Sequence, residues 1–165
     1  EHRSPVKVVF DARATLQPTA RMLAGGAATL VLAAADASAE RVAALTQAGA
    51  QVLAVATTAD GRVEVEDQLA VLARQGFGSV LVEGGAALGA ALLAADLIDE
   101  VVLARSDVVV GADGVPAPAR LNGPMPESAW YQAGFHEMGG DTIRTYLRKR
   151  QEFPCSQVSS PTSAR

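Results

Sequence analysis

Short apolar runs alternate with segments of helical periodicity along residues 6–104. The runs occupy residues 6–10, 28–33, 51–56, 79–83 and 100–104. They consist mainly of Val, Leu and Ala with few polar interruptions, which is typical of strands that are covered on both faces. Between them, apolar residues recur at helical spacing, and Gly49 and Gly76 stand where helices commonly end. Strands that alternate with crossover helices form βαβ units, so we predict an α/β fold with a largely parallel sheet flanked by helices.

The pattern changes after Ser106. A proline-rich stretch follows, and residues 130–138 and 142–149 then have the character of two strands joined at Gly139-Gly140-Asp141, a hairpin signal. We therefore predict an antiparallel hairpin added to the parallel sheet. Ser, Pro, Thr and Gln dominate from Gln151 onward, so we predict one domain over residues 1–150 and a disordered tail over residues 151–165.

Charge and composition exclude several classes of protein. The chain of 165 residues carries a net charge of −4, with its dense basic residues confined to residues 144–150, which argues against nucleic acid as a partner. The single cysteine fits a reducing compartment. His2 and His136 are isolated in the sequence, and no apolar stretch is long enough to span a membrane. We expect a cytoplasmic protein with no metal site.

The junction Val82-Glu83-Gly84-Gly85-Ala86-Ala87 carries the most chemical information. A strand that ends in a carboxylate is followed by two glycines and at once by a helix. Glycine lets a ligand approach the backbone closely, and the first turn of a helix offers unpaired N–H groups that favour a phosphate. The same residues also fit a tight strand-to-helix turn in which Glu83 caps its own helix. Both interpretations remain open on spacing alone.

Two well-known nucleotide-binding motifs are absent from the sequence. Gly84, Gly85 and Gly89 do not reproduce G-x-G-x-x-G, so the standard dinucleotide fingerprint is not present. Nothing matches G-x-x-x-x-G-K-[ST], which excludes the P-loop NTPases.

Two other segments are candidates for ligand contacts. Asp11 and Arg13 follow the first predicted strand, where a carboxylate and a guanidinium suit a ribose and a 2′-phosphate; a surface turn is the alternative. Gly111 lies in a glycine-bearing loop, residues 108–114, after the fifth predicted strand. That loop either closes over a cofactor or merely leads to the hairpin.

Several motifs in order resemble one known family. The run GFGSVLVEGG at residues 76–85, followed by LIDEVVL at residues 97–103, resembles the C-terminal reductase domain of the bifunctional riboflavin-biosynthesis deaminase-reductase. PVKVVFD at residues 5–11 and GGDTIR at residues 139–144 occur in the family's order, so the likeness covers residues 5–149. The resemblance implies a dihydrofolate-reductase-like fold, with a mixed sheet flanked by helices and a C-terminal antiparallel hairpin.

The resemblance also implies an activity. Similar proteins use NADPH to reduce 5-amino-6-(5-phosphoribosylamino)uracil, a phosphorylated pyrimidine ribosylamine, to its ribitylamino form. Glu83 matches the glutamate that lies at the substrate's sugar and is the predicted catalytic residue. The resemblance further implies a homodimer. The predicted cofactor-binding residues are Gly84, Gly85, Ala86, Ala87, Asp11, Arg13 and Gly111.

The sequence departs from the family pattern at three places. Family members carry an opening strand, a helix and a substrate-gripping segment that do not precede residue 5 here, so we expect this chain to be an N-terminally truncated part of a longer product. Ala12 stands where the family often has a hydroxyl residue, and residues 109–114 match only loosely. Three hypotheses therefore remain: a reductase, a non-catalytic nucleotide-binding protein, or a scaffold that keeps only the fold.

Overall fold

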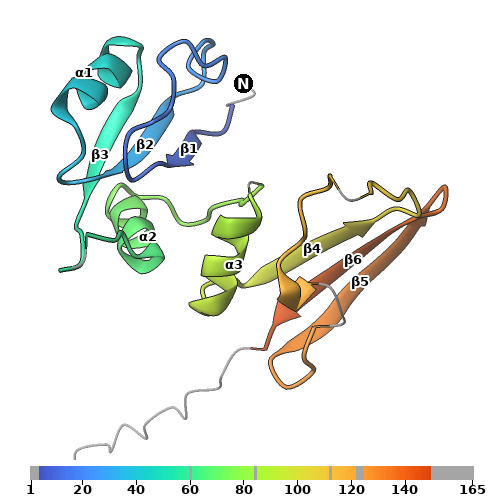
Figure 1. Ribbon diagram of the computed structural model, residues 1–165. Coiled ribbons are helices and arrows are strands. Elements are labelled where there is room, and N and C mark those ends of the chain that lie inside the picture. The colour runs from blue at the N-terminus through green and yellow to red at the C-terminus, as the bar shows by residue number, and fades with distance from the viewer. Residues whose placement is uncertain (1–3, 60, 84, 112, 122–124, 150–165) are drawn as a thin grey trace, which may run out of the picture. The chain divides into compact units, whose positions relative to one another are not determined.

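The computed structural model describes residues 4–59, 61–83, 85–111, 113–121 and 125–149. The chain forms two compact units, Glu1–Gly85 and Ala86–Arg165. The first unit contains β1 (Lys7–Phe10), β2 (Thr29–Ala34), α1 (Ala39–Gln47), β3 (Gln51–Val55) and α2 (Val65–Arg74). The second contains α3 (Ala86–Ala94), β4 (Glu100–Arg105), the short 3-10 helix η1 (Ala119–Leu121), β5 (Trp130–Met138) and β6 (Asp141–Arg148) (Figure 1).

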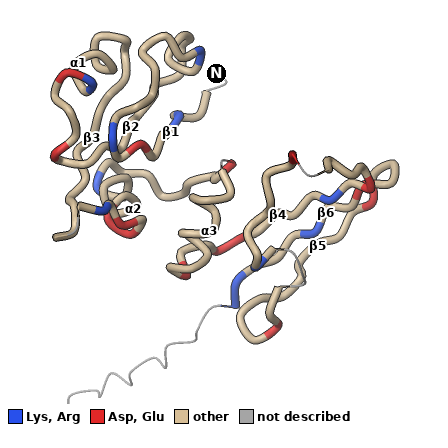
Figure 2. The backbone as a smooth tube through the Cα atoms, in the orientation of Figure 1, with Lys and Arg blue, Asp and Glu red and all other residues tan. Residues whose placement is uncertain are grey.

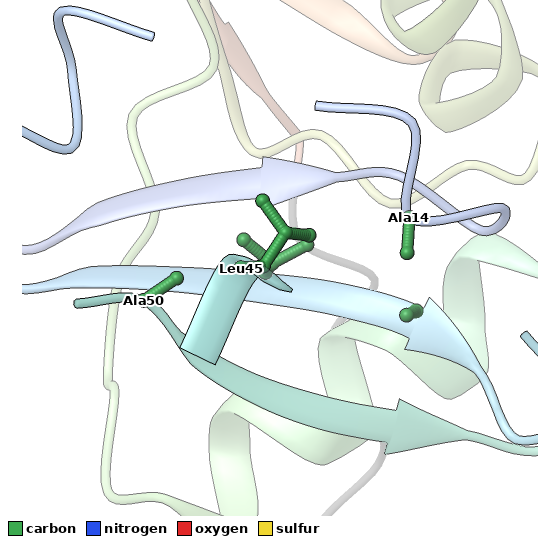
Figure 3. Packing of buried hydrophobic residues seen from close by; sticks show 5 residues of the cluster. Ala14, Leu45 and Ala50 are labelled. Carbon is green, nitrogen blue, oxygen red and sulfur yellow. The ribbon is translucent and has the colours of Figure 1, made fainter. Parts of the chain in front are cut away.

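The first unit is a parallel sheet in the order β1-β2-β3. Every residue of the central strand β2 is buried, as its nearly continuous apolar sequence predicts. Because side chains alternate along a strand, Val31 and Ala33 pack with Leu45 of α1, whereas Leu30 and Leu32 belong to a second cluster with residues of α2. The two helices thus give the sheet a separate apolar cluster on each face. Figure 3 shows the first of these clusters, with Leu45 beside the strands.

Helix α1 begins after Ser38 and ends where the sequence predicts, before Gly49. The Ser38 side chain accepts a hydrogen bond from the backbone N–H of Arg41, which satisfies a donor of the first turn. Gly49 ends the helix with φ of 94°, and its N–H donates to the Thr46 carbonyl. This left-handed conformation favours glycine because a Cβ would be strained there.

Replacing Gly49 by Ala should therefore destabilise the protein by about 1 kcal/mol, because L-residues pay roughly that much in the left-handed region. No atom would meet the added Cβ within 4 Å, so the cost comes from the backbone alone. Urea unfolding of the variant measures it. Gly26→Ala is the matched control, since Gly26 is also exposed and open but lacks a positive φ. Equal unfolding midpoints for the two variants would contradict the assignment of strain to Gly49.

The second unit is an antiparallel sheet in the order β4-β6-β5. The hairpin predicted at residues 139–141 is confirmed: Met138 pairs with Asp141, and Gly139 and Gly140 have φ of 61° and 101°. Positive φ at both positions is what a type I′ turn requires. The apolar cluster of the second unit combines Leu93 of α3 with residues from its three strands and from the loop before β5, namely Val101, Met125, Trp130 and Tyr146.

The α/β fold class is confirmed, but two predictions about its strands are wrong. Residues 79–83 were predicted as the fourth strand, yet they pair with no strand in the described part of the chain, and 82% of Leu81 is exposed. Apolar β-forming residues supply propensity, but a strand also needs a neighbour for its N–H and C=O groups. The predicted fifth strand, β4, joins the antiparallel hairpin and not the parallel sheet, because β6 supplies its hydrogen-bond partners. The predicted tail, residues 151–165, lies outside the described residues.

Candidate functional site

The carboxyl ends of β1 and β2 lie at the same edge of the parallel sheet, and the chain leaves each into a loop. In open α/β sheets this edge is where ligands bind. The loop after β1 continues alongside β2, since the Asp11 N–H donates to the Leu32 carbonyl and the Ala34 N–H donates to the Ala12 carbonyl, at 3.1 and 2.9 Å. The loop is therefore fixed to the sheet at its base.

The Asp11 side chain holds this loop in shape. One carboxylate oxygen accepts from the Thr15 hydroxyl at 3.0 Å, and the other accepts from the Leu16 N–H at 2.7 Å. Ala14, which lies in the sequence between Asp11 and Thr15, is buried and has φ of 51°. Asp11 thus has an observed role in ordering residues 11–16, and its predicted contact with a cofactor stays a prediction.

Arg13 projects from the same loop, and its side chain is exposed. A second arginine lies beside it: the Nη1 of Arg41, in the first turn of α1, donates to the backbone carbonyl of Arg13 at 3.4 Å. Within the described part of the chain, neither guanidinium has a carboxylate oxygen within 4 Å. Sequence analysis missed Arg41, because 28 residues separate it from Arg13 and only the folded chain brings the two together.

Glu83 lies close to the end of the first unit, Glu1–Gly85, and is exposed. Its carboxylate accepts no hydrogen bond and forms no ion pair within the residues that the structure describes, so Glu83 is not seen to cap a helix there. Gly84 lies outside the described residues, and Gly85 has φ of 58°, a conformation that favours glycine. The carboxylate is thus available to a ligand.

The remaining predicted site residues belong to the second unit. Helix α3 begins at Ala86 and continues with Ala87, so the predicted helix start is confirmed. The first N–H groups of a helix have no partner within it, so this turn can donate to an anion. Gly111 has φ of 86° in an exposed loop, and its carbonyl accepts from the Gly114 N–H at 3.2 Å.

The second unit also contains a cavity of about 250 Å³ that sequence analysis did not predict. Asp96, Arg120, Trp130 and Arg148 are among its lining residues. Arg148 forms an ion pair with Asp96, lies 5.8 Å from the centre of the Trp130 ring, and donates to the Ile98 carbonyl at 3.3 Å. The hydrogen bond from Arg148 to the Asp96 side chain lowers the pKa of that carboxyl below its ordinary value. The Nη1 of Arg120 donates to the Leu93 carbonyl at 2.8 Å. These contacts join β6 to the segment that follows α3, and η1 to α3 itself.

Charge is dispersed over the rest of the molecule. Figure 2 shows acidic and basic residues interspersed along both units. Each helix that the structure describes is too short or too polar to span a bilayer.

Comparison with known proteins places this geometry in a family. The profile of the RibD C-terminal domain matches residues 1–142. The riboflavin biosynthesis protein RibD of Bacillus amyloliquefaciens is 32% identical over 122 residues, which cover 73% of this chain and 32% of that protein. The 2,5-diamino-6-ribosylamino-4(3H)-pyrimidinone 5′-phosphate reductase of Archaeoglobus fulgidus is 33% identical over 113 residues, which cover 68% of this chain and 50% of the relative. The chain thus spans between a third and a half of the length of these relatives.

Solved structures share the fold. RibD of Acinetobacter baumannii superposes with a TM-score of 0.61 at 21% identity, covering 88% of this chain and 38% of that protein. A pyrimidine reductase-like protein of Corynebacterium diphtheriae gives 0.65 at 13% identity, covering 89% of this chain and 62% of that one. These neighbours have the dihydrofolate-reductase-like fold that the sequence motifs predicted. The motifs, the α/β architecture and the match over residues 1–142 agree, and the chain belongs to the RibD C-terminal domain family.

Proposed function

We propose that this chain is the reductase part of a riboflavin-biosynthesis enzyme. It uses NADPH to reduce 5-amino-6-(5-phosphoribosylamino)uracil to the ribitylamino form. The observation that carries the proposal is the family match over residues 1–142. Two curated relatives, at 33% and 30% identity, are named as reductases of a closely similar ribosylaminopyrimidine phosphate, which supports the substrate class.

Two arginines of the first unit support the choice of NADPH as the cofactor. Arg13 and Arg41 present guanidiniums without carboxylate partners at the ligand-binding edge of the parallel sheet. Such groups suit phosphate oxygens. In this proposal Asp11 and Arg13 contact the adenosine end of the cofactor. The backbone of Gly84, Gly85, Ala86 and Ala87 also contacts the cofactor. Gly111 belongs to the loop that lies against it.

The chemistry divides between cofactor and protein. When bound, NADPH supplies the hydride that C1′ of the opened sugar receives, and a proton completes the reduction. Glu83 is proposed to accept hydrogen bonds from the sugar of the substrate and to hold C1′ in position. The backbone near Gly85 and Ala86 has the conformational freedom and unpaired N–H groups to approach a phosphorylated ligand.

The setting of the enzyme is also part of the proposal. A cytoplasmic homodimer agrees with the biosynthetic role of the family. We further propose that residues 1–150 act as one reductase domain.

The test is turnover of NADPH with the pyrimidine substrate, together with binding of NADPH followed by its fluorescence. Oxidation of NADPH that depends on the substrate, with formation of the ribitylamino product, is the expected result. Binding without turnover would reject the reductase activity for this chain in favour of a non-catalytic nucleotide-binding protein. Absence of binding would leave only a scaffold of the same fold.

A further inference from the structure

We propose that Arg13 and Arg41 together bind the 2′-phosphate of the cofactor, which makes Arg41 a residue that selects NADPH over NADH. The inference rests on the proposed reductase function and names which residues would determine its cofactor preference. Two arginines from distant parts of the sequence meet at the loop that follows β1.

Each arginine is held by a different element of the first unit. Arg13 follows β1 in the loop that the Asp11 carboxylate orders through Thr15 and Leu16. Arg41 follows Ser38, whose side chain accepts from the Arg41 N–H and fixes the first turn of α1. The contact between the Arg41 Nη1 and the Arg13 carbonyl, at 3.4 Å, joins the loop to the helix. Two guanidiniums therefore stand on backbone segments that are ordered before any ligand arrives.

The charge balance of the cluster favours an anion. Within the described residues no carboxylate oxygen lies within 4 Å of either guanidinium, so both remain available to an anion. Arg41 uses Nη1 for the Arg13 carbonyl, and no other bond of its side chain is observed in that part of the chain. Planar forks of N–H donors match phosphate oxygens and can bind them in pairs.

The position of the two arginines in the sheet indicates that the anion is the phosphate of a nucleotide. Both residues lie where the chain leaves β1 and β2 at the carboxyl edge of a parallel sheet, which is the usual position of nucleotides in such sheets. The 2′-phosphate is what NADPH has and NADH lacks. One feature acts in the opposite sense: Asp36 follows β2 by two residues and is exposed. A carboxylate there would suit a free ribose hydroxyl and would repel a phosphate, so cofactor preference is a direct test.

The experiment measures dissociation constants for NADPH and NADH with the whole chain, by fluorescence and by calorimetry. Arg41→Gln should weaken NADPH binding about 10-fold and leave NADH binding unchanged within about twofold, since a hydrogen bond to a charged group is lost only with NADPH. Arg13→Gln should act in the same direction. The double variant should bind the two cofactors with about equal affinity. Arg41→Lys keeps the charge but not the fork, and should recover part of the loss.

Arg74→Gln is the matched control, because Arg74 is an exposed arginine in the last turn of α2 and removes the same charge. It should leave both dissociation constants unchanged. A wild-type chain that binds NADH as tightly as NADPH would overturn the role of the arginines while leaving the reductase proposal intact. Equal weakening of both cofactors by Arg41→Gln would also overturn it, because the residue would then support the loop and not the phosphate. A wild-type chain that binds neither cofactor would count against the proposed function itself.

Discussion

Replacing Glu83 by Gln should lower turnover of the pyrimidine substrate about 10²-fold, with NADPH affinity changed by less than about twofold. Gln keeps the size of the side chain but removes its negative charge and one acceptor. The structure leaves the carboxylate exposed, without a partner among the described residues, so the loss would come from contacts with substrate and not from the fold. Steady-state kinetics and a separate NADPH titration measure the two effects.

Glu66→Gln provides the comparison for Glu83. Glu66 is an exposed carboxylate in the first turn of α2, so its replacement makes the same chemical change on a helix surface. The Glu66 variant should retain full turnover. If Glu83→Gln lost NADPH affinity and turnover in equal measure, Glu83 would belong to the cofactor and not to the substrate.

Replacing Leu45 by Ala should lower the free energy of unfolding by about 2–5 kcal/mol. Leu45 is fully buried, and its cluster includes Val31 and Ala33 of β2 and Ala50, which follows α1 (Figure 3). Removing three carbon atoms there leaves a cavity beside the buried strand β2, which relaxation of the neighbouring side chains fills only in part. Urea unfolding followed by circular dichroism gives the difference.

Leu81→Ala removes the same atoms from a side chain that is 82% exposed. It should change the free energy of unfolding by less than about 0.5 kcal/mol, as surface substitutions usually do. A loss at Leu81 as large as that at Leu45 would contradict the exposure of residues 79–83 and would mean that this segment is covered in solution.

Local sequence was sufficient for most elements of the first unit. The nearly continuous apolar run of β2 predicted a strand buried on both faces, because a strand with one face in water would alternate apolar and polar residues. Gly49 marked the end of α1, because the left-handed turn that it forms involves only a few residues along the chain. Gly139 and Gly140 predicted the hairpin turn in the same way, since the ability to adopt a positive φ is a property of glycine itself.

Strand partners could not be predicted in the same way. Residues 79–83 and β4 both have strand-forming sequences, yet β4 pairs with β6 while residues 79–83 have no partner in the described part of the chain. Propensity is a property of the segment, whereas pairing depends on which other strand is within hydrogen-bonding distance. The same distinction holds for the candidate site, where residues could be predicted but their contacts could not. The sequence pointed to Asp11, Arg13 and Glu83, but it contained no sign that Asp11 would be occupied by its own loop.

By itself the sequence determined the α/β class, the family and the segments from which a nucleotide site could be built, because these follow from periodicity, turn residues and motifs that are local. Only the tertiary structure decided which strands pair and that Arg41 lies beside Arg13. Such contacts join residues far apart in the chain. They exist only once β1, β2 and α1 have packed, because it is the packed sheet and helix that bring the two loops to one edge.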